Sequence, residues 1–240
     1  MNKLSPAHRN RLLLAEIESS FPNDFMAIAC FITPDYEKYV PLWKKCIHEA
    51  YPHYEAVVIR DSDMPDAPKD PNKFAASRFL LAENLLDEFP YVLITDADIM
   101  IMPESKSILF QHFFWMRKHS LKCYSNSFDT VMRPSGVHFF THDWWETTRE
   151  ARAAQLEALE DAPSTWGMDE LILGKVIIES GLPVVKEPVL WNHHGIHLGQ
   201  LKRTQKVSLT GPQSVFLESL LKSADGEMLE LIKDFKRATE

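Results

Sequence analysis

Cysteine is scarce in this sequence, and the three cysteines that occur are far apart. They are Cys30, Cys46 and Cys123 in a chain of 240 residues. Such spacing fits neither a disulfide framework nor a zinc site, because both need paired or clustered cysteines. We therefore expect the protein to work in a reducing compartment.

Positive charge and long apolar runs are also scarce. Lysine and arginine total 26 against 34 aspartates and glutamates, which gives a formal net charge of -8. This balance disfavours nucleic acid or an anionic membrane as the main binding partner, because both attract clustered Lys and Arg. Residues 1–24 suggest an amphipathic N-terminal helix whose apolar run is too short and too charged for a signal peptide or membrane span. We expect a soluble cytoplasmic protein with no membrane partner.

What the sequence does contain, in its first half, is an alternation of strand-like and helix-like segments. Three short apolar segments are typical of buried parallel strands: residues 25–33, 55–61 and 91–94. Helices are expected between them at 36–50 and 74–89, and a loop rich in proline and aspartate covers 61–73. This order predicts an α/β fold with a Rossmann-like, mostly parallel central sheet flanked by helices.

The second half of the chain is less regular. Helices are expected at 105–118, 143–160 and 167–181, and extended segments at 136–140 and 183–191. An amphipathic helix at 213–238 closes the chain, within a C-terminal helical extension placed at 205–240. No internal repeat or linker is visible, so the sequence predicts a single domain over 1–240.

Two carboxylates, Asp96 and Asp98, interrupt the apolar segment YVLITDADIMIM. A second such pair, Asp61 and Asp63, opens a polar loop, where solvated carboxylates cost little. Between apolar neighbours, by contrast, unpaired carboxylates are penalised by desolvation and by each other. A positive group is therefore expected between Asp96 and Asp98.

A divalent cation is one candidate for that positive group. Residues i and i+2 of an extended chain face the same side, so Asp96 and Asp98 can share one cation at the carboxyl end of a strand, where open α/β sheets bind ligands. The alternative is that one aspartate caps a turn and the other pairs with a buried arginine. The segment WNHHGIHLGQLKR adds three possible ligands, His193, His194 and His197. Histidine suits Mn²⁺ better than Mg²⁺.

The same segment has groups suited to a diphosphate. Gly199 would let the backbone approach a phosphate closely, and Lys202 and Arg203 could neutralise its charge. The alternative is a solvated, histidine-rich loop.

FAASRFLLAENLLDEFPYVLITDADIMI, residues 74–101, resembles the central segment of GT-A nucleotide-sugar glycosyltransferases, particularly the glycogenin and galactosyltransferase group called family eight. There, an arginine-bearing helix leads into a strand that ends in an Asp-x-Asp metal motif. PSGVHFF, MDELIL and HLGQLK follow in the order of that family's later landmarks. Pro134 and Glu170 replace the family's Asn and Gln, and the spacing from His197 to Gly199 is one residue shorter.

The resemblance implies a metal-dependent glycosyltransferase that moves a sugar from a UDP-sugar to a hydroxyl acceptor with retention of configuration. By the same resemblance, Asp96, Asp98 and His197 would hold Mn²⁺ or Mg²⁺ on the donor diphosphate. His193 or His194 could take the place of His197. The donor would also meet Arg78, Gly199 and Lys202: Arg78 at the diphosphate or sugar, and Lys202 at the leaving phosphate. Asp61 and Asp63 could meet the base or ribose, or lie solvated in their loop.

Asp169 and Glu170, near the start of the helix expected at 167–181, are the candidate catalytic carboxylates. In an inverting enzyme, one of them would deprotonate the acceptor hydroxyl. In a retaining enzyme, one would flank the oxocarbenium-like centre or bind the sugar. The alternative is that Asp169 caps the helix and Glu170 lies in its first turn, where the helix dipole favours acids.

Three tryptophans are candidates for contact with the acceptor. Trp144, Trp145 and Trp166 are candidates because aromatic faces stack on sugars or bases; the alternative is that they are core residues. A phage-type enzyme that glycosylates hydroxymethylated bases in DNA is a second hypothesis, against which the acidic balance argues. A third is a nucleotidyltransferase-like nucleotide-binding protein, which would be expected to carry a glycine-rich basic loop. CFITPDYEKY, after the first strand, has no glycine.

Overall fold

A five-stranded mixed sheet in the order β2-β1-β3-β6-β5 forms the centre of the protein. The computed structural model describes residues 25–126, 137–185, 194–199 and 209–239. The strands are β1 (Ala27–Ile32), β2 (Glu55–Arg60), β3 (Tyr91–Thr95), β5 (Tyr124–Ser125) and β6 (His138–Thr141). β1 pairs in parallel with β2 and β3, and β6 runs antiparallel between β3 and β5. β6 alone therefore runs against the other strands, and the predicted α/β fold with a mostly parallel central sheet is confirmed.

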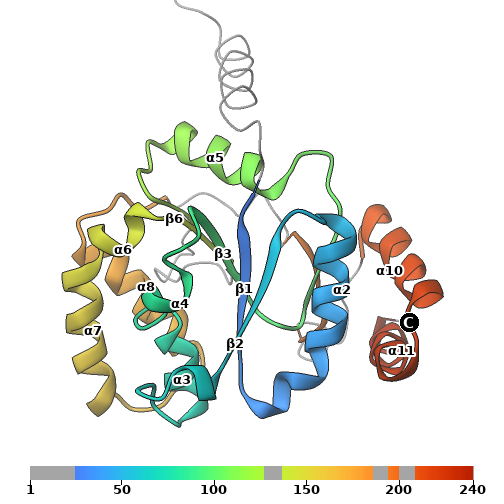
Figure 1. Ribbon diagram of the computed structural model, residues 1–240, viewed down its shortest axis with the longest axis horizontal. Coiled ribbons are helices and arrows are strands. Elements are labelled where there is room, and N and C mark those ends of the chain that lie inside the picture. The colour runs from blue at the N-terminus through green and yellow to red at the C-terminus, as the bar shows by residue number, and fades with distance from the viewer. Residues whose placement is uncertain (1–24, 127–136, 186–193, 200–208, 240) are drawn as a thin grey trace, which may run out of the picture.

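Helices cover both faces of this sheet (Figure 1). On one side lie α2 (Val40–Ala50), α10 (Gly211–Ser223) and α11 (Gly226–Thr239). On the other side lie α3 (Pro71–Ser77), α4 (Glu83–Leu86), α6 (Asp143–Thr147), α7 (Arg149–Asp161) and α8 (Met168–Glu179). Helix α5 (Ile108–His119) lies across one end. Short 3-10 helices η1 (Pro34–Tyr39) and η2 (Asp61–Asp63) follow β1 and β2.

A second, two-stranded antiparallel sheet joins segments that are far apart in the sequence. It pairs β4 (Ile99–Ile101) with β7 (Gly195–His197), and Ile99 lies opposite His197. Two further backbone hydrogen bonds extend the pairing, because Leu198 N–H donates to Asp98 O over 2.8 Å and Met102 N–H donates to His194 O over 2.9 Å. This sheet was not predicted. It brings His197 to the end of β3.

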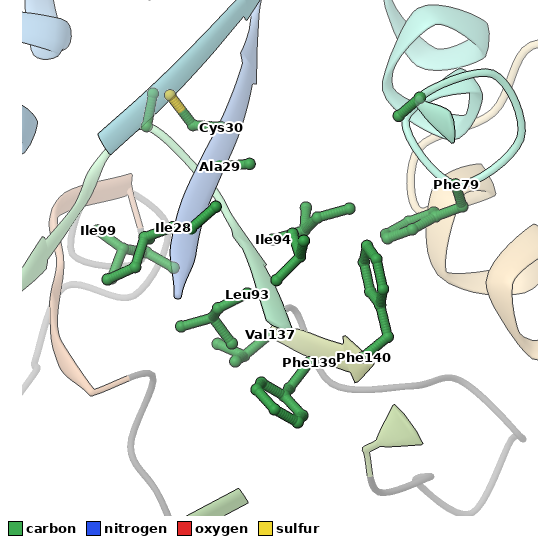
Figure 2. Close-up of a cluster of buried hydrophobic side chains, with 14 of the residues drawn as sticks. Ile28, Ala29, Cys30, Phe79, Leu93, Ile94, Ile99, Val137, Phe139 and Phe140 are labelled. Atoms are coloured by element: carbon green, nitrogen blue, oxygen red, sulfur yellow. The ribbon is translucent and has the colours of Figure 1, made fainter. Parts of the chain in front are cut away.

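The buried core is built on the central strands (Figure 2). Successive residues of a strand face opposite sides, so Leu93 of β3 and its neighbour Phe139 of β6 share one face of the sheet. Ile94 and Phe140 lie on the opposite face. All four side chains are almost completely excluded from solvent.

The helix expected at 74–89 is not continuous, and that part of the prediction is wrong. Helix α3 ends at Ser77 and α4 begins at Glu83. Between them, Phe79 N–H and Leu80 N–H donate to carbonyls only three residues back, a tightening typical of a helix end. The break leaves Arg78 at the C-terminal end of α3.

Two other expected helices are also divided. The segment 143–160 forms α6 and α7, separated at Thr148, whose hydroxyl donates to Trp144 O over 2.7 Å. The segment 213–238 forms α10 and α11, and Gly226, at the start of α11, has a φ of +50°. A positive φ lies in the left-handed region, which favours glycine, so α11 begins as a separate helix at Gly226.

Some predicted segments lie wholly or partly outside the described residues. These are the N-terminal helix within 1–24, residue 136 of the extended segment 136–140, residues 186–191 of the extended segment 183–191, and residues 205–208 and 240 of the C-terminal extension. Residues 183–185, which are described, form no strand.

Candidate active site

A cavity of about 240 Å³ opens where β3 ends. Asp96 and Asp98 follow β3 directly, at the carboxyl edge of the parallel strands, where open α/β sheets bind ligands. The wall is completed by the start of η1, by α3 and by the first turn of α8. The predicted donor-site residues Arg78, Asp96, Asp98 and His197 and the predicted catalytic pair Asp169 and Glu170 all line this cavity.

Asp96, Asp98 and His197 can offer their ligand atoms to one cation. One such atom from each residue lies within 4.8 Å of the other two, and His197 Nε2 lies 3.3 Å from Asp98 Oδ1. The β4–β7 pairing creates this arrangement, since it sets His197 beside the backbone that carries Asp98. Two carboxylates and an imidazole form a donor set that suits Mn²⁺.

The surroundings of Asp98 also fit a bound cation. The residue is only 4% exposed, and its Oδ1 is buried without a hydrogen-bond partner. A buried carboxylate oxygen in that state is costly, and a cation would offset the cost. Gly199 leaves room on the other side of the carboxylate, because a Cβ at position 199 would lie 2.2 Å from Asp98 Oδ2. Gly199 thus lies against a candidate metal ligand.

Arg78 joins two of the cleft's carboxylates. Its Nη1 donates to Asp96 Oδ1 over 2.7 Å and its Nη2 donates to Asp169 Oδ2 over 2.5 Å. Burial acts to lower the pKa of Arg78, but the two carboxylates outweigh it and raise that pKa above its usual range. Asp96 therefore does pair with a buried arginine, as the alternative interpretation of the Asp-x-Asp pair held, while it also faces the candidate cation site.

Asp169 and Glu170 lie in the first turn of α8, with Gly167 at the N-cap. Gly167 has a φ of +74°, which favours glycine, and no side chain caps the helix. Asp169 is therefore not the cap. Its side chain instead accepts from Arg78, and both carboxylates line the cavity. The first turn of α8 holds two acids beside the candidate cation site.

His194 is not placed with the aspartates. Its Nδ1 lies 2.9 Å from Glu104 Oε2 and its Nε2 lies 3.1 Å from His112 Nε2, and both histidines are fully buried. Burial and the nearby His194 hold the pKa of His112 well below its ordinary value. These contacts hold His194, the residue just before β7. Sequence reasoning missed Glu104 and His112, because neither lies in a motif.

The remaining candidate residues differ in whether they line the cavity. Asp63 Oδ2 accepts from Arg60 N–H over 2.8 Å, and neither Asp61 nor Asp63 is among the described residues that line the cavity. Trp144 and Trp145 are buried, so the core interpretation holds for them, whereas Trp166 is 68% exposed and lines the cavity. His193, Lys202 and Arg203 lie outside the described residues.

Comparison by sequence finds no match, either to a protein-family model or to a curated protein. Comparison by structure finds solved glycosyltransferases. The apo form of GlyE from Streptococcus pneumoniae TIGR4 overlaps with a TM-score of 0.48 at 11% identity, over 91% of this chain and 65% of that one. An active-site mutant of LgtC gives 0.42 at 14% identity, over 67% and 72% of the two chains.

A third solved structure, the bifunctional glycosyltransferase WbbM, gives a TM-score of 0.43 at 11% identity and covers 90% of this chain. This chain spans 65% of the length of GlyE and 45% of the length of WbbM. GlyE and WbbM are glycosyltransferases.

None of the helices in the described parts of the chain combines the length and the apolar composition of a membrane span.

Proposed function

We propose that this protein is a metal-dependent glycosyltransferase that moves a sugar from a UDP-sugar to a hydroxyl acceptor with retention of configuration. One observation carries the proposal: the ligand atoms of Asp96, Asp98 and His197 gather at a cavity that is also lined by Arg78, Asp169 and Glu170. Sugar transfer from a nucleoside diphosphate sugar needs stabilisation of the leaving diphosphate and of positive charge at the sugar. A bound cation can supply the first and carboxylates the second.

The places of the residues around the cavity support the roles proposed for them. Asp96, Asp98 and His197 would hold Mn²⁺ or Mg²⁺, which supplies electrostatic stabilisation of the leaving diphosphate when bound. Arg78 orients Asp96 and Asp169 by a hydrogen bond to each. Lys202, outside the described residues, is the proposed second cation at the leaving phosphate.

Asp169 and Glu170 are proposed to face the reacting sugar. Asp169 is held by Arg78 in the cavity wall, where its carboxylate oxygens can accept hydrogen bonds from sugar hydroxyls. Glu170 lies beside it in the first turn of α8 and lines the same cavity, and we assign it the stabilisation of positive charge at the anomeric carbon. Retention is proposed from the sequence resemblance to family eight.

The test is a thermal-shift screen against UDP-, GDP-, CDP-, ADP- and TDP-sugars, each with and without Mn²⁺. A ligand that binds only the folded state raises the melting temperature by mass action. We expect a shift that needs both UDP-sugar and Mn²⁺, and ¹H NMR of the transfer product should then show the anomer of the donor. No shift with any nucleotide sugar would refute the proposal, and an inverted product would refute retention alone.

A further inference from the structure

Trp166 is a large aromatic side chain left exposed at the rim of the cavity. Its exposed fraction is 68%, whereas Trp43, Trp115, Trp144 and Trp145 are buried in the described core. An exposed tryptophan at the rim of a cavity offers a large apolar face on which a ligand can stack.

The backbone beside Trp166 is anchored to α3. Asn72 Nδ2 donates to Ser164 Oγ over 2.9 Å, and Ser164 Oγ donates to Asp70 Oδ1 over 2.7 Å. Lys73 Nζ donates to the carbonyl of Glu160 over 2.7 Å. Asp70 is also the N-cap of α3, since it accepts from the backbone N–H groups of Asn72 and Lys73. The segment that leads to Trp166 is therefore tied to the wall of the same cavity.

The position of Trp166 along the chain places it beside the proposed catalytic carboxylates. Only Gly167 and Met168 separate it from Asp169, and Trp166, Gly167, Asp169 and Glu170 all line the cavity. A molecule resting on the indole would therefore reach the side of the cavity where the sugar is proposed to react.

Charge selects the class of that molecule. Among the described residues of the cavity wall, four are acidic, Asp96, Asp98, Asp169 and Glu170, and the permanent cation is Arg78. A divalent cation would be matched by the donor's own diphosphate, which leaves a negative wall for the second substrate. Such a wall repels phosphodiesters and carboxylates but accepts hydrogen bonds from hydroxyl groups.

We propose that Trp166 forms the platform of an acceptor subsite for a neutral saccharide, with the indole stacked on the apolar face of the acceptor sugar ring. The inference rests on the proposed glycosyltransferase function and names its acceptor class. Aromatic stacking of this kind contributes about one order of magnitude in affinity.

The first experiment uses fluorescence, which does not depend on turnover. Acrylamide quenching is measured for the wild type and Trp166→Phe with UDP and Mn²⁺ present, and the difference between them isolates the signal of Trp166. Lactose, maltose and cellobiose serve as neutral probes, and hydroxymethylated duplex DNA serves as the anionic one. Protection of Trp166 by a disaccharide is expected. Protection by DNA alone, or by none of the probes, would overturn the proposal.

The second experiment separates the two substrates kinetically, with a disaccharide that protects Trp166. Trp166→Ala is expected to raise the acceptor KM about tenfold, more than it raises the donor KM, and Trp166→Phe should restore most of the loss. Val215→Ala, an exposed apolar truncation on α10, is the control. If acceptor KM is unchanged in Trp166→Ala while UDP and Mn²⁺ still shift the melting temperature, this inference fails and the proposed function stands. If none of the nucleotide sugars shifts the melting temperature of the wild type with Mn²⁺ present, both fail.

Discussion

Arg78 Nη1 donates a hydrogen bond to Asp96 Oδ1 over 2.7 Å, so one of the two aspartates after β3 already has a counter-charge of its own. The buried Oδ1 of Asp98 accepts no hydrogen bond, and its basic neighbour is the imidazole of His197, whose Nε2 lies 3.3 Å away. The two residues of the motif are thus chemically unequal. Asp98 is expected to depend most on a bound cation, and Asp96 to be oriented by the protein.

Asp98→Asn should abolish the Mn²⁺-dependent shift in melting temperature caused by UDP, because the amide removes the charge that binds the cation. Stability without ligand should match or exceed that of the wild type, since a buried carboxylate is replaced by a neutral group. Thermal unfolding with and without UDP and Mn²⁺ measures both effects. Asp61→Asn, in the other Asp-x-Asp pair, is the control. An unfolded Asp98→Asn protein would mean instead that Asp98 is structural.

Gly199→Ala should weaken Mn²⁺ binding by about 10-fold to 100-fold, the effect usual for disturbing a group that supports a metal ligand. The added Cβ would lie 2.2 Å from Asp98 Oδ2 and would displace that carboxylate. Gly211→Ala is a matched control, because nothing lies within 4 Å of a Cβ at that position. Mn²⁺ titration followed by electron paramagnetic resonance compares the two variants. Equal Mn²⁺ affinities of the two variants would contradict a role for Asp98 as a metal ligand.

Arg78→Ala should lower the free energy of unfolding by roughly 3 kcal/mol, because it leaves the partly buried carboxylates of Asp96 and Asp169 without their shared partner. Urea unfolding measures the loss. Adding Asp169→Asn to Arg78→Ala should recover part of it, since one unpaired charge disappears. Arg60→Ala, which breaks an exposed pair with Glu37, should have little effect. A loss no greater than that of Arg60→Ala would contradict the bridging role.

Stability should fall as the pH drops below about 6.5, the pKa of an exposed histidine. Burial, reinforced by the charge of Arg78, lowers the pKa of His138 in the folded protein to about 3. Between those values the unfolded chain binds a proton that the folded protein does not, so acid favours unfolding by up to about 1.4 kcal/mol per pH unit for each such group. His112 acts in the same direction, because its pKa is also lowered by burial.

The pH effect is measured by urea unfolding between pH 5 and pH 8. His138→Phe keeps an aromatic ring beside Phe79 and Trp144 and removes the titrating group, so its stability should depend less steeply on pH than that of the wild type. His48→Asn, at an exposed position on α2, should leave the slope unchanged. Identical slopes for the wild type and His138→Phe would show that His138 does not titrate as predicted.

Local pattern was sufficient to predict the first three strands of the central sheet and the place of the Asp-x-Asp pair. Short apolar segments bounded by proline and aspartate predicted β1, β2 and β3 within two residues at each end. The boundaries of the helices were less predictable. Ser77 and Glu83 lie in one stretch of good helix formers, and the break between them depends on hydrogen bonds that only the folded chain makes.

The sequence by itself determined the chemistry: which carboxylates lie among apolar residues, that an arginine precedes them, and that histidines and glycines follow far along the chain. Tertiary structure decided which of these groups meet. The β4–β7 pairing selected His197 over His194 as the neighbour of Asp98, and burial separated Trp144 and Trp145 from the exposed Trp166. Those outcomes depend on contacts between segments that are far apart in the sequence. The residue pattern of one segment predicts its local structure but does not show which distant segment it will contact.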